Sequence, residues 1–143
     1  MQLLISSAML VELQQLALDA APAETCGILF GEDGKVSGYR AAQNVADDPS
    51  RHFEIDPAIL IETERDSRNG GKPILGYYHS HPVGPVRPSI TDAESAAPDH
   101  RIWLILNGRD AAAWRAVEDG EIYSRFDAIV LDCFGANGQT VEE

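Results

Sequence analysis

The sequence has few cysteines, no long hydrophobic run and no basic leader. Among its 143 residues the only cysteines are Cys26 and Cys133, which form no CxxC pair. A disulfide framework and a closed zinc site made of thiolates therefore have little support. No stretch reaches the ~18 consecutive apolar residues of a membrane span. Because residues 1–7 also lack the basic start of a signal peptide, we expect a cytoplasmic protein with no membrane association.

Basic residues are scarce too. The chain has 11 Lys and Arg against 23 Asp and Glu, which gives a formal net charge of −12. Binding to a phosphate backbone requires clustered basic side chains, so we expect no nucleic-acid partner. With 44% hydrophobic and 24% charged residues, the composition is that of a soluble globular protein. The length suits one core, and no linker or repeat interrupts it, so residues 1–143 are predicted to form a single domain.

Hydrophobic periodicity and turn residues predict an α/β fold with a mixed sheet flanked by helices. The predicted strands cover residues 1–5, 25–30, 35–42, 51–55, 73–78, 102–106, 111–117 and 121–129. Helices are expected from the N-cap Ser7 to Ala21, from Asp56 to about Arg68 with a Glu64–Arg68 pair, and over 89–97. Turn signals near residues 31–34, 107–108 and 119–120 indicate hairpins, and the last three strands form an antiparallel meander. The tail 135–143 is expected to be frayed.

The stretch 74–94 carries the clearest chemical signal. An apolar strand ends in His79 and His81, and residues at i and i+2 of a strand point to the same face. The proline-rich segment 82–88 must form a loop, and this loop can return Asp92 towards the histidines. Two imidazoles and one carboxylate, with the fourth position left for water, are the ligands of a catalytic zinc ion. The sequence therefore predicts a zinc site at this point.

Each of these residues also has an ordinary explanation. A His-x-His at the end of a strand is often only a pair of polar residues at the mouth of a loop. Ser89 is a good helix N-cap, and Asp92 is favoured in the first helical turn by the helix dipole. The conjunction of the two signals across a short loop is what favours metal binding. His52 and His100 have no ligand-like spacing, and we treat them as ordinary polar residues.

The spacing of His79, His81, Ser89 and Asp92 resembles the JAMM signature, also called MPN-plus, of zinc metalloproteases. The family's pattern has a glutamate on an early strand, and Glu24 in the segment Glu-Thr-Cys-Gly-Ile-Leu-Phe-Gly matches it. This resemblance implies a fold similar to that of cytidine deaminases. It also implies that the two histidines and the aspartate hold zinc, that Glu24 is the general base and acid, and that the Ser89 hydroxyl stabilises the oxyanion. Helix capping remains the rival role for Ser89.

The resemblance also implies a substrate. JAMM proteases hydrolyse bonds that follow the C-terminal tail of ubiquitin or ubiquitin-like proteins. This compact chain is similar to the small stand-alone bacterial members, some of which process sulfur-carrier proteins that end in Gly-Gly. We therefore expect a zinc-dependent metallopeptidase or isopeptidase whose partner is a ubiquitin-like or sulfur-carrier protein with such a tail.

Other activities stay open at this stage. One alternative is a non-catalytic MPN-type binding scaffold, although scaffolds of that type lack the ligands present here. Another is a DNA-associated protein similar to RadC, which shares the histidine and aspartate pattern but conflicts with the acidic charge. A Cys26 nucleophile is disfavoured because that residue lies in an apolar segment without a nearby activating charge. The sequence contains no His-Glu-x-x-His motif, which excludes the commoner zincin arrangement.

Overall fold

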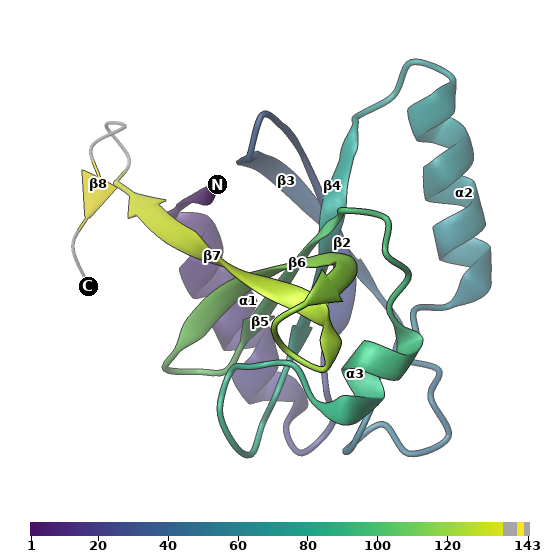
Figure 1. The fold of residues 1–143 in the computed structure, drawn as a ribbon, viewed down its shortest axis with the longest axis vertical. Helices are drawn as coiled ribbons and strands as arrows, with labels where there is room; N and C mark the ends of the chain where they lie inside the picture. Colours follow the sequence, from purple (N-terminus) through teal and green to yellow (C-terminus); the bar gives the residue numbers. More distant parts are fainter. Residues whose placement is uncertain (136–139, 142–143) are drawn as a thin grey trace.

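A computed structural model describes residues 1–135 and 140–141 of the chain, with eight strands and three helices in the described part (Figure 1). The helices are α1 (Ser7–Ala20), α2 (Pro57–Arg68) and α3 (Ile90–Ser95). The strands are β1 (Gln2–Ser6), β2 (Cys26–Glu32), β3 (Lys35–Ala42), β4 (Ile74–Ser80), β5 (Ile102–Leu106), β6 (Ala111–Gly120), β7 (Ser124–Phe134) and β8 (Thr140–Val141). The predicted mixed α/β architecture is confirmed.

All strands belong to one mixed sheet in the order β1-β3-β2-β4-β5-β6-β7-β8. β1 also pairs with β7, so the sheet curls until its first and seventh strands in that order meet. The pairs β4–β5 and β1–β7 are parallel, while β2–β4, β5–β6 and β6–β7 are antiparallel. The predicted antiparallel meander is therefore confirmed. β4 lies between β2 and β5 in the middle of the sheet, which makes its end a rigid place for functional side chains.

The alternation of side chains divides the core between the two faces of the sheet. On one face, α1 buries Leu10, Leu13 and Ala17, whose helical spacing forms a single apolar stripe, against residues that include Leu29 and Tyr78. On the other face, α2 packs its apolar first half against a cluster that includes Cys26, Ile28 and Phe30 of β2. Figure 1 shows α1 behind the sheet and α2 to its right. Helices cover both faces, as the sequence predicts.

The segment 51–55 does not form the predicted strand. It contributes only an isolated bridge between Ile55 and Asn44. The Asn44 side chain supplies most of the order here, because its Nδ2 donates to the carbonyls of Glu24 (3.0 Å) and His52 (3.0 Å) while its Oδ1 accepts from the amides of Ala46 and Glu54. The side-chain amide thus adds to the two backbone hydrogen bonds that join this segment to residues 43–45, from Val45 to Glu54 and from Asp56 to Gln43. The alternating residues Phe53 and Ile55 suggested a strand, but both turn into the core instead.

Several element ends differ from the prediction. Ser6, not Ser7, caps α1, since its Oγ accepts from the Met9 amide at 3.1 Å. β6 continues to Gly120 and β7 starts at Ser124, because the turn falls at residues 121–123 and not at 119–120. The third helix covers only Ile90–Ser95. Most of the predicted frayed tail lies outside the described residues, but within it Thr140–Val141 pairs with β7.

The predicted Glu64–Arg68 pair is replaced by a longer-range contact. The Glu64 carboxylate accepts from both terminal nitrogens of Arg101, at 2.6 and 3.2 Å, and Arg101 also donates to the Tyr77 hydroxyl. Hydrogen bonding from Arg101 is the main reason that the pKa of Glu64 is lowered. Because Glu64 belongs to α2 and Tyr77 to β4, this contact fixes the helix against the sheet. A helical i,i+4 pattern cannot reveal a partner 37 residues further on.

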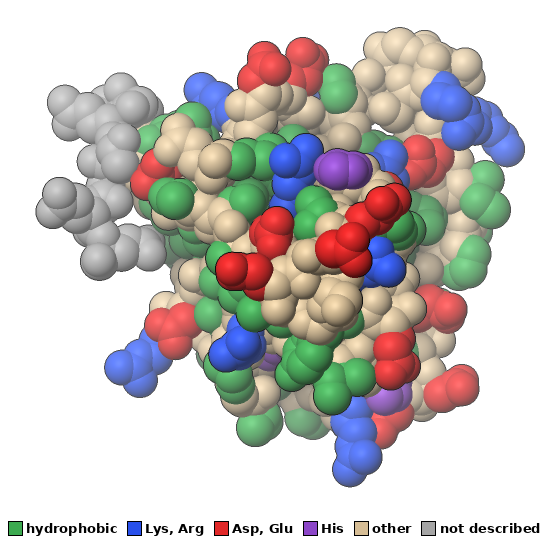
Figure 2. Space-filling model, viewed as in Figure 1, with side chains coloured by type: hydrophobic (Ala, Val, Ile, Leu, Met, Phe, Trp, Pro, Cys, Tyr) green, Lys and Arg blue, Asp and Glu red, His purple; other side chains and the backbone are tan. Residues whose placement is uncertain are grey.

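No helix in the described part of the chain is long and apolar enough to cross a membrane. The surface seen in Figure 2 carries acidic side chains among hydrophobic and neutral ones, with Lys and Arg scattered singly. The hairpin formed by β6 and β7 exposes Glu118, Asp119, Glu121 and Asp127. This distribution does not provide the basic stripe that nucleic-acid backbones require.

Candidate metal centre

The register of β2 and β4 places three of the predicted site residues on one face of the sheet. His79 lies opposite Cys26 in the antiparallel pair, so both side chains point to the α2 side. His81 follows His79 by two residues, and Glu24 precedes Cys26 by two, so both continue on that side just beyond the strand ends. The neighbouring ends of two central strands therefore bring residues 24, 79 and 81 together.

The first turn of α3 supplies the fourth residue of the group. Ser89 Oγ accepts from the Asp92 amide at 3.0 Å, and Asp92 Oδ2 accepts from the Ser89 amide at 2.9 Å, which makes a reciprocal capping box. The capping role predicted for Ser89 is thus confirmed. The same box fixes the direction of the Asp92 carboxylate, which is 4% exposed.

The atoms of this group converge closely. His79 Nε2 lies 3.0 Å from His81 Nε2, and Asp92 Oδ2 lies 3.2 Å from each of these nitrogens. All three residues are buried. A carboxylate oxygen of Glu24 lies within 4.8 Å of the ligand nitrogens of both histidines, so Glu24, His79 and His81 also qualify as a potential metal-binding trio. The structure thus brings together all the residues that the sequence singled out.

Hydrogen bonding at His81 shows that this arrangement suits a cation. His81 Nδ1 lies 3.0 Å from the Pro85 carbonyl, which can only accept, so Nδ1 carries a proton, and whenever the ring is neutral Nε2 carries a lone pair. Asp92 Oδ2 also offers lone pairs, only 3.2 Å away. Such atoms repel each other unless a proton or a cation lies between them. Ligands of one tetrahedral zinc ion are separated by about 3.3 Å for bonds of about 2.0–2.1 Å, so the observed separations fit the ion.

Burial and hydrogen bonding set the charge states of the group. Burial acts against ionisation of Asp92, but hydrogen bonds from His79 and His81 hold its pKa well below the usual range. Burial lowers the pKa of His79, which keeps that ring neutral and able to donate a lone pair. Burial acts to lower the pKa of His81 as well, but hydrogen bonds to Asp92 and Pro85 outweigh it and raise that pKa. An anionic oxygen therefore faces at least one neutral imidazole.

Glu24 has a buried carboxyl group with one oxygen that lacks a hydrogen-bond partner. It is 6% exposed, and burial raises its pKa from the ordinary value of 4.5 to about 7. Its Oε1 is one of four buried side-chain polar atoms without a hydrogen-bond partner in the described part of the chain, and His79 Nδ1 is another. Buried polar atoms are seldom left unpaired, so the unpaired Oε1 indicates that a ligand or solvent molecule belongs beside Glu24.

Aromatic side chains form the wall behind the histidines. The Phe53 ring stacks on His79 with centroids 4.2 Å apart and planes inclined by 21°, and Trp103 meets the same imidazole edge to face. No local pattern points to Phe53 or Asn44, because both act through residues distant in the chain. Phe53 also borders a cavity of about 410 Å³ between α2, α3 and the sheet.

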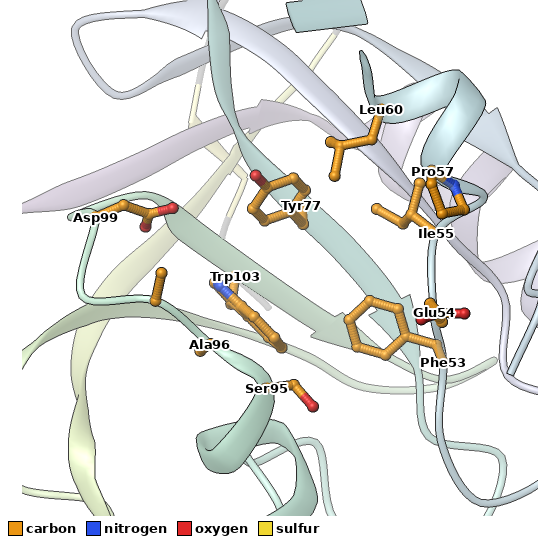
Figure 3. A pocket seen from close by; sticks show the side chains of 11 residues that line it. Phe53, Glu54, Ile55, Pro57, Leu60, Tyr77, Ser95, Ala96, Asp99 and Trp103 are labelled. Carbon is orange, nitrogen blue, oxygen red and sulfur yellow. The ribbon is translucent and has the colours of Figure 1, made fainter.

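This cavity is mainly apolar. Figure 3 shows Leu60, Tyr77, Ile55, Phe53 and Trp103 surrounding it, with Asp99 and Glu54 at its edges. Phe53 is shared by the wall of this cavity and the surroundings of the candidate metal centre, because it also stacks on His79. Another cavity of about 330 Å³ includes Glu24, His81 and Ser89 in its wall.

Cys26 does not take part in nucleophilic chemistry. Burial, with a smaller contribution from the charge of Glu24, raises the pKa of its thiol to about 12. Its Sγ lies 3.7 Å from the Ala42 carbonyl and is covered by the apolar cluster of β2. The thiolate required for attack is therefore not formed at neutral pH.

Comparison with known proteins adds a family relationship. Residues 6–118 match the family described as prokaryotic homologs of the JAB domain. A protein of Haloferax volcanii named desampylase is 34% identical over 88 residues, which are 60% of this chain and 63% of that protein, so the match spans less than two thirds of the relative. A desampylase of Pyrococcus furiosus is 30% identical over 73% of this chain and 75% of its own length.

Further similarities extend over more of the chain. A Thermus thermophilus protein named probable TtuB-protein conjugate cleaving protease is 28% identical over 83% of this chain and 78% of its own length. The solution structure of a Desulfitobacterium hafniense protein superposes with a TM-score of 0.77 at 26% identity and covers 94% of both chains. A Salinibacter ruber protein gives a TM-score of 0.58 at 28% identity and covers 89% of this chain and 90% of its own.

Proposed function

This chain belongs to the family of prokaryotic homologues of the JAB domain, and from that membership we propose that it is a zinc-dependent metallopeptidase or isopeptidase. Its substrate is the amide bond after the C-terminal tail of a ubiquitin-like or sulfur-carrier protein, as the names of the desampylase and conjugate-cleaving relatives suggest. The observation that carries the proposal is the convergence of His79 Nε2, His81 Nε2 and Asp92 Oδ2 within 3.2 Å.

His79, His81 and Asp92 would hold the zinc ion. Glu24 is the other carboxylate in reach, but Asp92 Oδ2 is closer to both nitrogens at once and is oriented by the Ser89 amide, as metal ligands usually are. Zinc supplies Lewis acidity, which brings the pKa of water from ~15.7 towards ~7 and polarises a carbonyl oxygen.

Glu24 is the proton carrier in this proposal. Its buried, unpartnered oxygen can take a proton from the attacking water and deliver it to the amine that leaves. Burial raises its pKa to about 7, which lets the same group act as base and then as acid near neutral pH. The Asn44 amide holds the backbone of Glu24 in place by donating to its carbonyl at 3.0 Å.

Ser89 supports both the local structure and the reaction. Its Oγ uses one lone pair to accept from the Asp92 amide, and this leaves the hydroxyl proton free to be donated. Ser89 lines the cavity that contains Glu24 and His81, so that proton can reach the oxygen of a scissile carbonyl. Capping and oxyanion stabilisation therefore use different parts of one hydroxyl group.

The C-terminal tail of the substrate would bind in the apolar cavity beside Phe53. The apolar cavity beside Phe53 can take a hydrophobic side chain of an extended tail, and Phe53 itself stacks on His79. A Gly-Gly terminus suits the buried histidines because it presents no side chains that must fit beside them. The acyl part of the substrate would thus lie on the Phe53 side, and the leaving amine on the Glu24 side.

The proposal is tested with ubiquitin-like carrier proteins that bear short extensions after Gly-Gly. We expect the zinc-loaded protein to remove the extension at the last glycine, as read from the intact mass of the carrier. The metal-free protein should not cleave it, and added zinc should restore cleavage. Cleavage restricted to unrelated peptides, or equal cleavage without metal, would rule out the proposed activity.

Replacement of Ser89 separates its two roles. Ser89→Ala is expected to lower kcat by about 10²–10³ through loss of the oxyanion donor. Ser89→Gly should lower it equally, although glycine preserves most of the capping energy and differs in stability by only a few tenths of a kcal/mol. Ser89→Thr retains the hydroxyl and should remain active. If kcat instead followed the melting temperature across the three variants, capping alone would account for the effect.

The alternatives in other classes have less support. A binding scaffold has no need for an unpaired buried glutamate beside two imidazoles and an aspartate. A role on DNA conflicts with the exposed acidic residues of the β6–β7 hairpin. The cytoplasmic location and the similarity to the cytidine-deaminase fold stay predictions.

A further inference from the structure

The cavity of about 330 Å³ beside the candidate metal centre contains a cationic side chain that the proposed reaction has not used. Its wall includes Glu24, His81, Ser89 and Arg51, and Arg51 is the only Lys or Arg among the described residues that line it. In a chain with a net charge of −12, a guanidinium in the same cavity wall as the buried Glu24 is suited to bind an anionic part of a ligand.

The backbone that carries Arg51 is tied to the backbone that carries Glu24. The Glu24 amide donates to the Pro49 carbonyl at 2.7 Å, and the Arg51 amide donates to the Asp48 carbonyl at 3.0 Å. Asn44 Nδ2 joins the two segments by donating to the Glu24 and Pro49 carbonyls at 3.0 and 3.4 Å. The backbone of Arg51 therefore keeps a fixed position relative to the backbone of the proposed proton carrier.

The guanidinium itself remains available. Its ion pair with Asp48 joins Nε to Oδ2 at 3.6 Å, and the Arg51 side chain is 79% exposed, so this contact is weak. Asp48 is further engaged through Oδ1, which accepts from the Ser50 hydroxyl at 2.8 Å. The pair uses neither terminal amino group of Arg51. These two groups form the planar fork that binds a carboxylate through two parallel hydrogen bonds.

The chemistry of hydrolysis decides which part of the substrate reaches this cavity. Glu24 must give its proton to the amine that leaves, so the leaving residue lies on the side of Glu24 and hence beside Arg51. In a residue attached through its α-amine, the α-carboxylate is separated from the leaving nitrogen by a single carbon. In a lysine attached through its side chain, the α-carboxyl is far away and is an uncharged amide when the lysine is part of a protein.

We propose that Arg51 binds the α-carboxylate of the leaving residue, so that this protein preferentially removes a terminal amino acid from a carrier tail and cleaves lysine isopeptides less well. This inference rests on the proposed hydrolytic function and adds a choice of substrate to it. The reaction balances as simple hydrolysis. The carbonyl-to-nitrogen bond breaks, a bond from water oxygen to the carbonyl carbon forms, and one water proton passes to the leaving amine; the products are a carrier with a free glycine carboxylate and a free amino acid.

The test uses one carrier with three leaving groups. A ubiquitin-like sulfur-carrier protein is extended after Gly-Gly by one alanine, prepared as the free acid and as the primary amide, and is also joined to the side-chain amine of N-acetyl-lysine amide. For the zinc-loaded wild type we expect kcat/KM for the free acid to exceed that for the amide and the isopeptide by about tenfold to a hundredfold. This preference should weaken as salt is raised, because the contact is partly exposed.

Arg51 variants assign the preference to one side chain. Arg51→Gln is expected to bring the ratio of kcat/KM for the free acid to kcat/KM for the amide close to one. Arg51→Lys should retain part of the preference for the free acid. Arg87→Gln is the matched control, since Arg87 lies on the neighbouring loop, is exposed and does not line the cavity. Thermal melting and zinc content of each variant confirm that fold and metal are retained.

The outcomes are distinct. Equal cleavage of acid and amide by the wild type, or a fall in both rates together in Arg51→Gln, overturns the role of Arg51 and leaves the proposed hydrolysis intact. Cleavage of none of the three substrates by the zinc-loaded wild type overturns the proposed function, and the substrate choice with it.

Discussion

Glu24→Gln is expected to lower kcat for carrier cleavage by a factor of about 10²–10⁴ while about one zinc ion per chain remains bound. Glutamine has the shape of glutamate but cannot take a proton from water and pass it to an amine. The loss should appear in kcat and not in KM, because in the proposed reaction Glu24 would act on the reacting atoms while the tail would bind beside Phe53.

The comparison with Glu24→Asp sharpens this prediction. Aspartate can carry a proton but its carboxylate is one methylene further back, so we expect intermediate activity. Steady-state kinetics and zinc analysis on the same preparations give both readouts. Two outcomes would contradict the account. Activity of Glu24→Gln within tenfold of the wild type would exclude Glu24 as the proton carrier, and loss of zinc would make Glu24 a ligand in place of Asp92.

Stability provides a control on the fold of this variant. In the metal-free protein burial raises the pKa of Glu24 to about 7 from 4.5, so the folded state binds a proton more tightly than the unfolded chain does. The contribution of this group to stability is present in full below pH 4.5 and is lost as pH rises through about 7. Glutamine mimics the protonated form. Metal-free Glu24→Gln should therefore melt no lower than the wild type, and the difference should grow between pH 5 and pH 8.

Asp92→Asn is expected to abolish metal binding and activity together. The substitution preserves the shape of the side chain and an oxygen that can accept from the Ser89 amide, which maintains the helix cap. It removes the negative charge that Asp92 Oδ2 directs at both imidazole nitrogens. With a neutral amide oxygen in that position, we expect zinc content to fall from about one per chain to below about a tenth under the same purification.

Glu94→Gln is the matched control for this variant. It removes one charge from the same short helix, but at an exposed position two residues beyond Asp92, and should retain both zinc and activity. His79→Ala should also lose zinc, although it leaves a void beneath the Phe53 ring, so its melting temperature must be measured alongside. Retention of zinc and turnover by Asp92→Asn would show that the carboxylate is not a ligand.

The parts of the site that could be predicted from sequence are those encoded locally. His79 and His81 lie two residues apart on one strand, and Ser89 and Asp92 lie three apart in one helical turn, so their relative directions follow from strand and helix geometry. The convergence of the two pairs followed from the short loop between them. Glu24 was found only by resemblance, since its place beside the histidines depends on the pairing of β2 with β4.

The features of the fold and the site that were not predicted from sequence depend on contacts between distant residues, which no local pattern encodes. Asn44 orders the predicted strand over residues 51–55 as a loop by binding the carbonyls of Glu24, Pro49 and His52, and a lone asparagine in a loop gives no sign of this. The ion pair of Glu64 with Arg101 and the stacking of Phe53 on His79 join distant parts of the chain in the same way. Arg51 acquires its place in the cavity wall because this loop is fixed beside Glu24.

The most direct test of the central claim is an anomalous diffraction map of the wild-type protein, crystallised after purification without chelators and measured on both sides of the zinc absorption edge. The account predicts one strong zinc peak at about 2.0–2.2 Å from His79 Nε2, His81 Nε2 and Asp92 Oδ2, with Glu24 beyond direct bonding distance. Zinc bound elsewhere, or at this point through Glu24 with Asp92 turned away, would contradict it.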